Sequence, residues 1–142
     1  MKESIFSTVV GCIGAFICTL FGGWSEAMTT LIIFMAFDYV TGLLVAGFFK
    51  KSKKTKSGSL SSNAAVKGLI KKGGELLVVL VACRLDLTLN TDYIQTAAII
   101  AFITSETISL VENLGLMGVP MPKVITNAIE LLKGENENES QN

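Results

Sequence analysis

Long apolar runs with almost no charge are the feature that most restricts the fold of this 142-residue chain. Residues 5–21 contain no charged side chain, residues 28–49 contain only Asp38, and residues 93–111 contain only Glu106. A run of about 18 apolar residues or more is typical of a helix that crosses the ~30 Å hydrocarbon core of a membrane. The chain is also only 17% charged, where a soluble domain is about 25% charged. We therefore expect an all-α, polytopic membrane protein.

Four transmembrane helices are predicted, over residues 5–21, 28–49, 75–91 and 93–111. The third is short, because Arg84 and Asp86 interrupt its apolar run, and the alternative is a re-entrant segment. A cleaved signal peptide is the competing interpretation of residues 5–21. We favour a span, because the run is long for a signal and Glu26 would be unusual at the cleavage site.

The segments outside these spans are polar. Residues 50–72 form a basic loop, and residues 123–133 have the spacing of a short helix at the membrane surface. Residues 1–133 are expected to form one transmembrane helical domain. Residues 134–142 are acidic and poor in apolar residues, which predicts a disordered tail.

The distribution of lysines predicts the orientation. Eight of the twelve basic residues lie between Lys50 and Lys72, and loops rich in Lys and Arg stay in the cytoplasm. With four spans, both termini are then cytoplasmic too. Lys67, Lys71 and Lys72 are predicted to lie at the membrane surface on a short amphipathic helix, near anionic headgroups. The alternative is a solvated, basic approach to the next span.

Three charged residues are predicted within the membrane: Asp38, Arg84 and Glu106. Charges at that depth are costly, so they usually face protein or water and serve a function. Asp38 and Arg84 are expected at similar depth, which favours an ion pair within or between subunits. The alternatives are a protonated Asp38 hydrogen-bonded to a neighbouring helix, or a water-lined pathway. We expect these residues to act in assembly or gating.

Small residues recur every four positions in three of the apolar runs, a spacing that lets helices approach closely in lipid. With four spans in so short a chain, these faces favour a homo-oligomer. The candidate packing residues are Gly11, Ala15, Gly42, Ala46, Ala97, Ala101, Ser105 and Ser109.

The sequence argues against an enzyme, a metal site or a bound cofactor. Histidine is absent, and the chain has no phosphate-binding P-loop, no HExxH pattern and no CxxC pattern. Five lysines among residues 50–56 do not indicate nucleic-acid binding, because the positive-inside bias explains basic residues between two spans.

Four strings resemble the phage holin family that also contains clostridial toxin-secretion holins. They are "FDYVTGLL" (37–44), "SS…KGLIKK" (61–72), "ETISLVEN" (106–113) and "GVPMPK" (118–123). The match runs in order through most of the chain. The family pattern maps onto Asp38, Thr41 and Gly42, onto residues 67–72, onto Glu112 and Asn113, and onto Pro120 and Pro122.

The resemblance implies a protein that oligomerises in the bacterial cytoplasmic membrane and permeabilises it at a set time. Cell lysis then follows from release of an endolysin, a functional partner with which no stable complex is expected. Some relatives instead help to export toxins. The rival classes are a small four-helix channel or transporter that uses an intramembrane carboxylate, and a purely structural membrane-interaction subunit.

Overall fold

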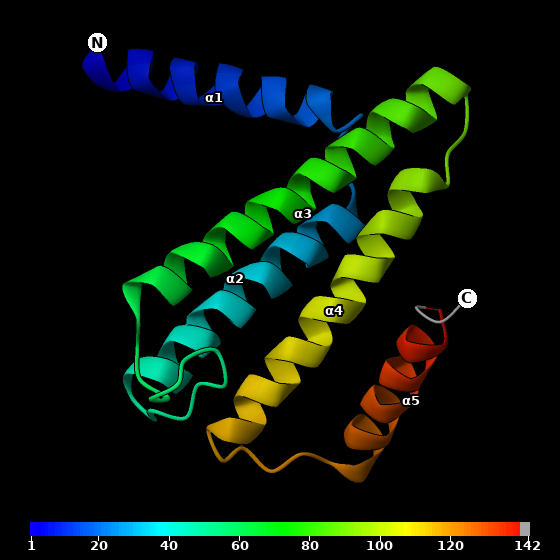
Figure 1. The fold of residues 1–142 in the computed structure, drawn as a ribbon. Helices are drawn as coiled ribbons and strands as arrows, with labels where there is room; N and C mark the ends of the chain where they lie inside the picture. Colours follow the sequence, from blue (N-terminus) through cyan, green and yellow to red (C-terminus); the bar gives the residue numbers. More distant parts are fainter. Residues whose placement is uncertain (140–142) are drawn as a thin grey trace.

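The computed structural model describes residues 1–139, except for the side chains of residue 132 and residues 135–139. The regular elements of the described chain are all helices (Figure 1): α1 (Lys2–Leu20), α2 (Glu26–Gly47), α3 (Ser62–Leu89), α4 (Ile94–Leu116) and α5 (Lys123–Glu139). The all-α prediction is confirmed. Helices α1, α2 and α4 are each long and apolar enough to cross a membrane, and they coincide with three of the predicted spans.

Helix α3 differs from the prediction. A surface helix ending near Lys72 and a separate short span were expected, yet residues 62–89 form one continuous helix of 28 residues. The Gly73–Gly74 pair lies inside it without breaking it, and Lys72 just before the pair is held by its ion pairs to α2 and α4. Because α3 carries several charges, it is not among the helices apolar enough to be a candidate span on composition.

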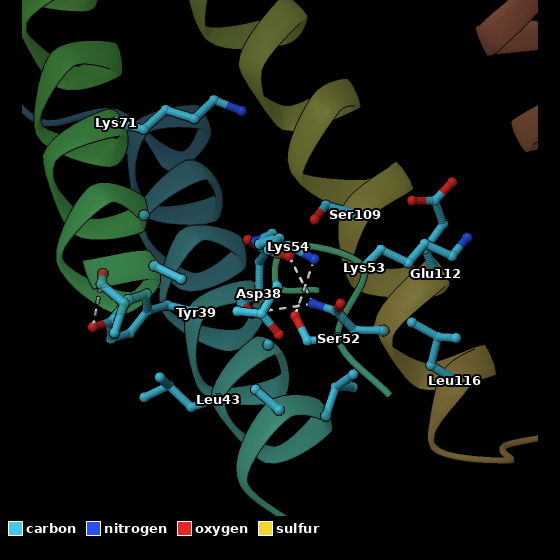
Figure 2. A pocket seen from close by; sticks show the side chains of 18 of the residues that line it. Asp38, Tyr39, Leu43, Ser52, Lys53, Lys54, Lys71, Ser109, Glu112 and Leu116 are labelled. Carbon is cyan, nitrogen blue, oxygen red and sulfur yellow. Dashed lines mark hydrogen bonds between the residues drawn. The ribbon is translucent and has the colours of Figure 1, made fainter. Parts of the chain in front are cut away.

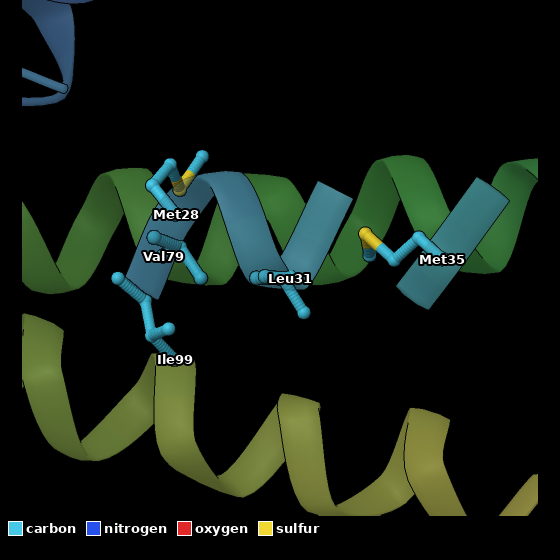
Figure 3. Close-up of a cluster of buried hydrophobic side chains, with 5 residues drawn as sticks. All are labelled: Met28, Leu31, Met35, Val79 and Ile99. Atoms are coloured by element: carbon cyan, nitrogen blue, oxygen red, sulfur yellow. The ribbon is translucent and has the colours of Figure 1, made fainter. Parts of the chain in front are cut away.

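Helices α2, α3 and α4 pack into one bundle (Figure 1). α3 runs antiparallel to both of its neighbours. Five buried side chains form the apolar core near one end of this bundle: Met28, Leu31, Met35, Val79 and Ile99 (Figure 3). Lipid tails are as apolar as these side chains, so in a membrane this end is held by close van der Waals packing of the helices.

The same end of the bundle is closed by Asp86 near the end of α3. Its carboxylate accepts hydrogen bonds from the Thr91 hydroxyl (2.6 Å), the Gln95 backbone N–H (2.8 Å) and the Ile94 backbone N–H (3.1 Å). The first turn of a helix has backbone N–H groups without helical partners. Asp86 therefore caps α4 from the preceding helix, and Asn90 in the left-handed conformation (φ 56°) turns the chain between them.

Helix α1 stands apart from the bundle (Figure 1) and buries none of its residues. The turn after it does touch the bundle: a Cβ at Gly22 (φ +71°) would lie only 2.9 Å from the Cys83 sulfur. The apolar surface of α1 is thus left for lipid or another protein.

Helix α5 lies beside the lower half of α4 in Figure 1. Ile129 is buried there, and the Lys133 ammonium pairs with the Glu112 carboxylate. α5 continues to Glu139, beyond the predicted surface helix of 123–133, because glutamate is a good helix former. Residues 140–142 of the predicted tail lie outside the described residues.

Candidate functional site

A buried ion-pair network joins the three bundle helices. Lys72 Nζ on α3 lies 2.8 Å from Asp38 Oδ2 on α2 and 2.5 Å from Glu106 Oε2 on α4. The exposed fractions of the three side chains are only 13%, 6% and 4%. One ammonium therefore holds two carboxylates from two different helices.

The seven-residue spacing of the sequence places these charges inside the bundle. Residues seven apart lie on nearly the same face of a helix. Each bundle helix has three residues at this spacing that lie inside the bundle: Leu31, Asp38 and Val45 on α2, Lys72, Val79 and Asp86 on α3, and Ile99, Glu106 and Asn113 on α4. Leu31, Val79 and Ile99 form an apolar layer, and Asp38, Lys72 and Glu106 form the charged layer next to it.

Asn113 extends the network. Its side-chain amide donates to Asp38 Oδ1 (3.0 Å), to the Asp38 backbone carbonyl (3.2 Å) and to the Thr41 hydroxyl (3.1 Å). A Cβ at Gly42 would lie 3.7 Å from the same amide nitrogen, an ordinary van der Waals contact, so Gly42 lies directly against Asn113. The second carboxylate oxygen of Asp38 is thereby satisfied without a second cation.

Glu75 lies one turn along α3 from Lys72 and is 6% exposed. Its Oε1 is 3.7 Å from the Lys71 ammonium, which is mostly exposed, and its Oε2 has no hydrogen-bond partner in the described part of the chain. A buried carboxylate oxygen without a partner is costly. The bundle thus carries more buried acid than Lys72 alone can balance.

Within this chain Asp38 pairs with Lys72 and not with Arg84, while a pair of Asp38 with Arg84 of another subunit stays a prediction. Arg84 is exposed on α3 and makes no ion pair with any described residue. A third span of 75–91 places Arg84 at the depth of Asp38, but α3 begins at Ser62. The longer helix brings Lys72 to the level of Asp38 and carries Arg84 toward the end near the α3–α4 turn.

The three lysines predicted at the membrane surface separate into two kinds. Lys67 and Lys71 are exposed. Lys72 is turned into the bundle, so its assignment as a surface residue is corrected. The physical reason is its position seven residues before Val79, on the face of α3 that packs against α2 and α4.

The candidate packing residues also differ in their surroundings. Gly42 and Ala46 face the bundle, and Ser109 is half-buried. The others are exposed: Gly11, Ala15, Ala97, Ala101 and Ser105. Their predicted role in contacts between copies of the chain stays a prediction.

A cavity of about 180 Å³ lies at the network's end of the bundle (Figure 2). Asp38, Lys72, Glu106 and Asn113 line it on one side, and the loop of residues 50–61 contributes Lys53 and Lys54. Within the described residues, no group of histidine, cysteine or carboxylate side chains is arranged to hold a metal ion.

The sequence matches the bacteriophage holin family over residues 15–134. The chain belongs to the bacteriophage holin family. The resemblance inferred from the four strings is thereby confirmed. Holins are not a family of enzymes, and family membership together with the apolar helices indicates a cytoplasmic membrane protein.

Relatives of this holin family member cover most of its length. An uncharacterized protein from Clostridium perfringens is 35% identical over 126 residues, or 87% of each chain. An uncharacterized protein from Listeria monocytogenes is 35% identical over 128 residues, 87% of this chain and 86% of the relative. A probable holin of Bacillus phage phi105 is 29% identical over 120 residues, 84% and 83% of the two chains. No solved structure matches.

The structure brings together residues on which the resemblance to holins rests. Asp38, Thr41, Gly42 and Asn113 come from two strings far apart in sequence, and they meet at one contact between α2 and α4. Sequence reasoning missed that Lys72 would complete this contact. The seven-residue spacing of Lys72 and Val79 indicates Lys72 only if one helix continues through Gly73 and Gly74, and the local sequence does not predict that continuation.

Proposed function

We propose that this chain is a holin that accumulates in the bacterial cytoplasmic membrane, oligomerises and permeabilises it at a timed moment. Permeabilisation would release an endolysin and lead to host cell lysis. The match to the holin family over residues 15–134 carries this proposal. The probable phage holin among the relatives supports it.

The proposed topology has four spans and both termini cytoplasmic, with α3 added to the three candidate spans α1, α2 and α4. At ~1.5 Å per residue, the 28 residues of α3 extend about 42 Å, which exceeds the ~30 Å hydrocarbon core. Lys72, Glu75 and Asp86 on α3 are turned into the bundle, as charged residues in membrane helices usually are. Lys67, Lys71 and Arg84 on the same helix are exposed, and long basic side chains of this kind can extend toward the headgroups. The lysines of residues 50–56 favour a cytoplasmic loop.

The ion-pair network holds α2, α3 and α4 together and so keeps the bundle closed until a lesion forms. While Lys72 binds Asp38 and Glu106, the charges are hidden and the bundle presents apolar surface to lipid. Separation of α2, α3 and α4 would expose those charges, which are stable in a membrane only if they face water or other protein. An oligomer of opened bundles would satisfy them by lining a water-filled lesion.

The surfaces available for oligomerisation are the exposed small residues Ala97, Ala101 and Ser105 on α4, and Gly11 and Ala15 on α1. Small residues at this spacing permit close helix contact in lipid. The endolysin is proposed as a functional partner without a stable complex, and neither nucleic acid nor a cofactor takes part.

Two other functions remain in contention. Export of a toxin would use the same membrane lesion. A small channel or transporter is the second candidate, because Asp38 and Glu106 are carboxylates buried among candidate membrane helices. A transporter would give ion or substrate flux without cell death.

Induced expression in bacteria, with and without a co-expressed endolysin, separates these functions. For a holin we expect an abrupt loss of viability in both cultures, with lysis only when the endolysin is present. Continued growth with a steady ion flux would instead favour the channel or transporter. An intact membrane at high expression would overturn the proposed function.

A further inference from the structure

The mouth of the cavity beside the ion-pair network is basic. Lys53 and Lys54 of the loop and Lys71 of α3 all line the cavity, and all three are exposed to solvent. Figure 2 shows Lys53 beside the α4 residues Ser109 and Glu112, with Lys71 projecting from α3 on the other side. The loop therefore folds back over the bundle and places Lys53 and Lys54 at the mouth of the cavity.

The acids that line the same cavity are already paired. Lys72 holds Asp38 and Glu106, and Lys133 holds Glu112. In contrast, the ammonium groups of Lys53 and Lys54 form no ion pair with any residue that the structure describes. The positive charge at the mouth is thus available to a ligand, while the carboxylates deeper in the cavity repel an anion and keep it at the mouth.

The rest of the lining suits a phosphate attached to an apolar body. Hydroxyl groups of Ser52 and Ser61 lie at the cavity and can donate hydrogen bonds. Leu43, Leu60 and Leu116 add apolar side chains to the lining of the same cavity. Basic pockets between membrane helices on the cytoplasmic side are a recognised place for lipid headgroups.

We propose that this mouth binds the phosphate group of an anionic phospholipid. The phosphate lies against Lys53 and Lys54, and the glycerol end of the acyl chains contacts the leucines that line the cavity. The site is independent of lesion formation, and it would tether the loop of residues 50–61 to the end of the bundle.

Native mass spectrometry of the full chain in detergent tests the site directly. Phosphatidylglycerol, phosphatidylcholine and inorganic phosphate are added separately, and the singly bound species is titrated. The variant Lys53→Gln/Lys54→Gln is compared with Lys51→Gln/Lys56→Gln, which removes the same charge from loop positions that do not line the cavity. All four lysines are exposed, so neither variant should disturb folding, and circular dichroism checks helix content.

We expect one tightly held phosphatidylglycerol on the wild-type chain and on Lys51→Gln/Lys56→Gln. Lys53→Gln/Lys54→Gln should bind it roughly 30-fold more weakly, at about fivefold per lysine near an anionic lipid. If both variants weakened phosphatidylglycerol binding equally, general surface charge would explain the binding and the proposal would be overturned. If the wild-type chain retained phosphatidylcholine as well as phosphatidylglycerol, the site would not select an anionic lipid, which would also overturn the proposal. Displacement of the lipid by inorganic phosphate alone would show a site for free phosphate and overturn the lipid assignment.

Discussion

Lys72 Nζ lies within 3 Å of both Asp38 Oδ2 and Glu106 Oε2, at 2.8 Å and 2.5 Å. The three residues come from three different helices, so a single ammonium links the whole bundle. Removal of one partner from a buried ion pair is far more costly than exchange of an exposed one, because it leaves charge uncompensated.

Lys72→Met keeps most of the side-chain volume and removes the ammonium. Asp38 and Glu106 then face each other as buried carboxylates, and we expect a loss of about 3–5 kcal/mol in the free energy of unfolding. Denaturant unfolding of the detergent-solubilised chain measures it. Lys67→Met, at an exposed position of the same helix, is the matched control and should change stability by less than about 0.5 kcal/mol. Equal stability of the two variants would contradict a structural role for the network.

Asn113→Leu removes the amide that donates to Asp38 and Thr41. The Asp38 Oδ1 atom would lose its partner, which costs about 1–3 kcal/mol for a buried acceptor. The same unfolding measurement applies, with Asn127→Leu on the exposed face of α5 as control. If Asn113→Leu were as stable as that control, the amide contact would carry no net stabilisation.

Asp86→Ala removes the cap of α4. Two backbone N–H groups, those of Ile94 and Gln95, lose their acceptor, and loss of such a cap costs about 0.5–2 kcal/mol. Hydrogen exchange should become faster in the first turn of α4 while the rest of the helix is little changed. Asp92→Ala, in the same turn but exposed, is the comparison. Unchanged protection of residues 94–97 in Asp86→Ala would show that the cap is dispensable.

Much of the fold follows from the sequence, because apolar runs fix where membrane helices lie. Helices α1, α2 and α4 fall where residues 5–21, 28–49 and 93–111 predict them. The buried positions of Asp38 and Glu106 also follow, since a lone carboxylate in an apolar run must face protein or water.

The partner of Asp38 could not be predicted in the same way. Lys72 belongs to a lysine-rich string that is typical of a helix at the membrane surface, and two glycines follow it. Only the continuous course of α3 through Gly73 and Gly74 places Lys72 opposite Asp38. Helix length, and with it the depth of each charge, depends on tertiary contacts that a local pattern does not contain.

The time from induction to loss of membrane potential tests most directly whether the network keeps a holin closed. Lys72→Met and Lys67→Met are expressed at matched membrane levels, together with the triple variant Asp38→Asn/Lys72→Met/Glu106→Gln, which removes all three charges. We expect Lys72→Met to depolarise the membrane earlier than wild type. The triple variant should depolarise the membrane later than Lys72→Met, though still earlier than wild type. Lys67→Met should take the same time as wild type. If Lys72→Met and Lys67→Met depolarised the membrane at the same time as wild type, the network would not be the device that holds the bundle closed.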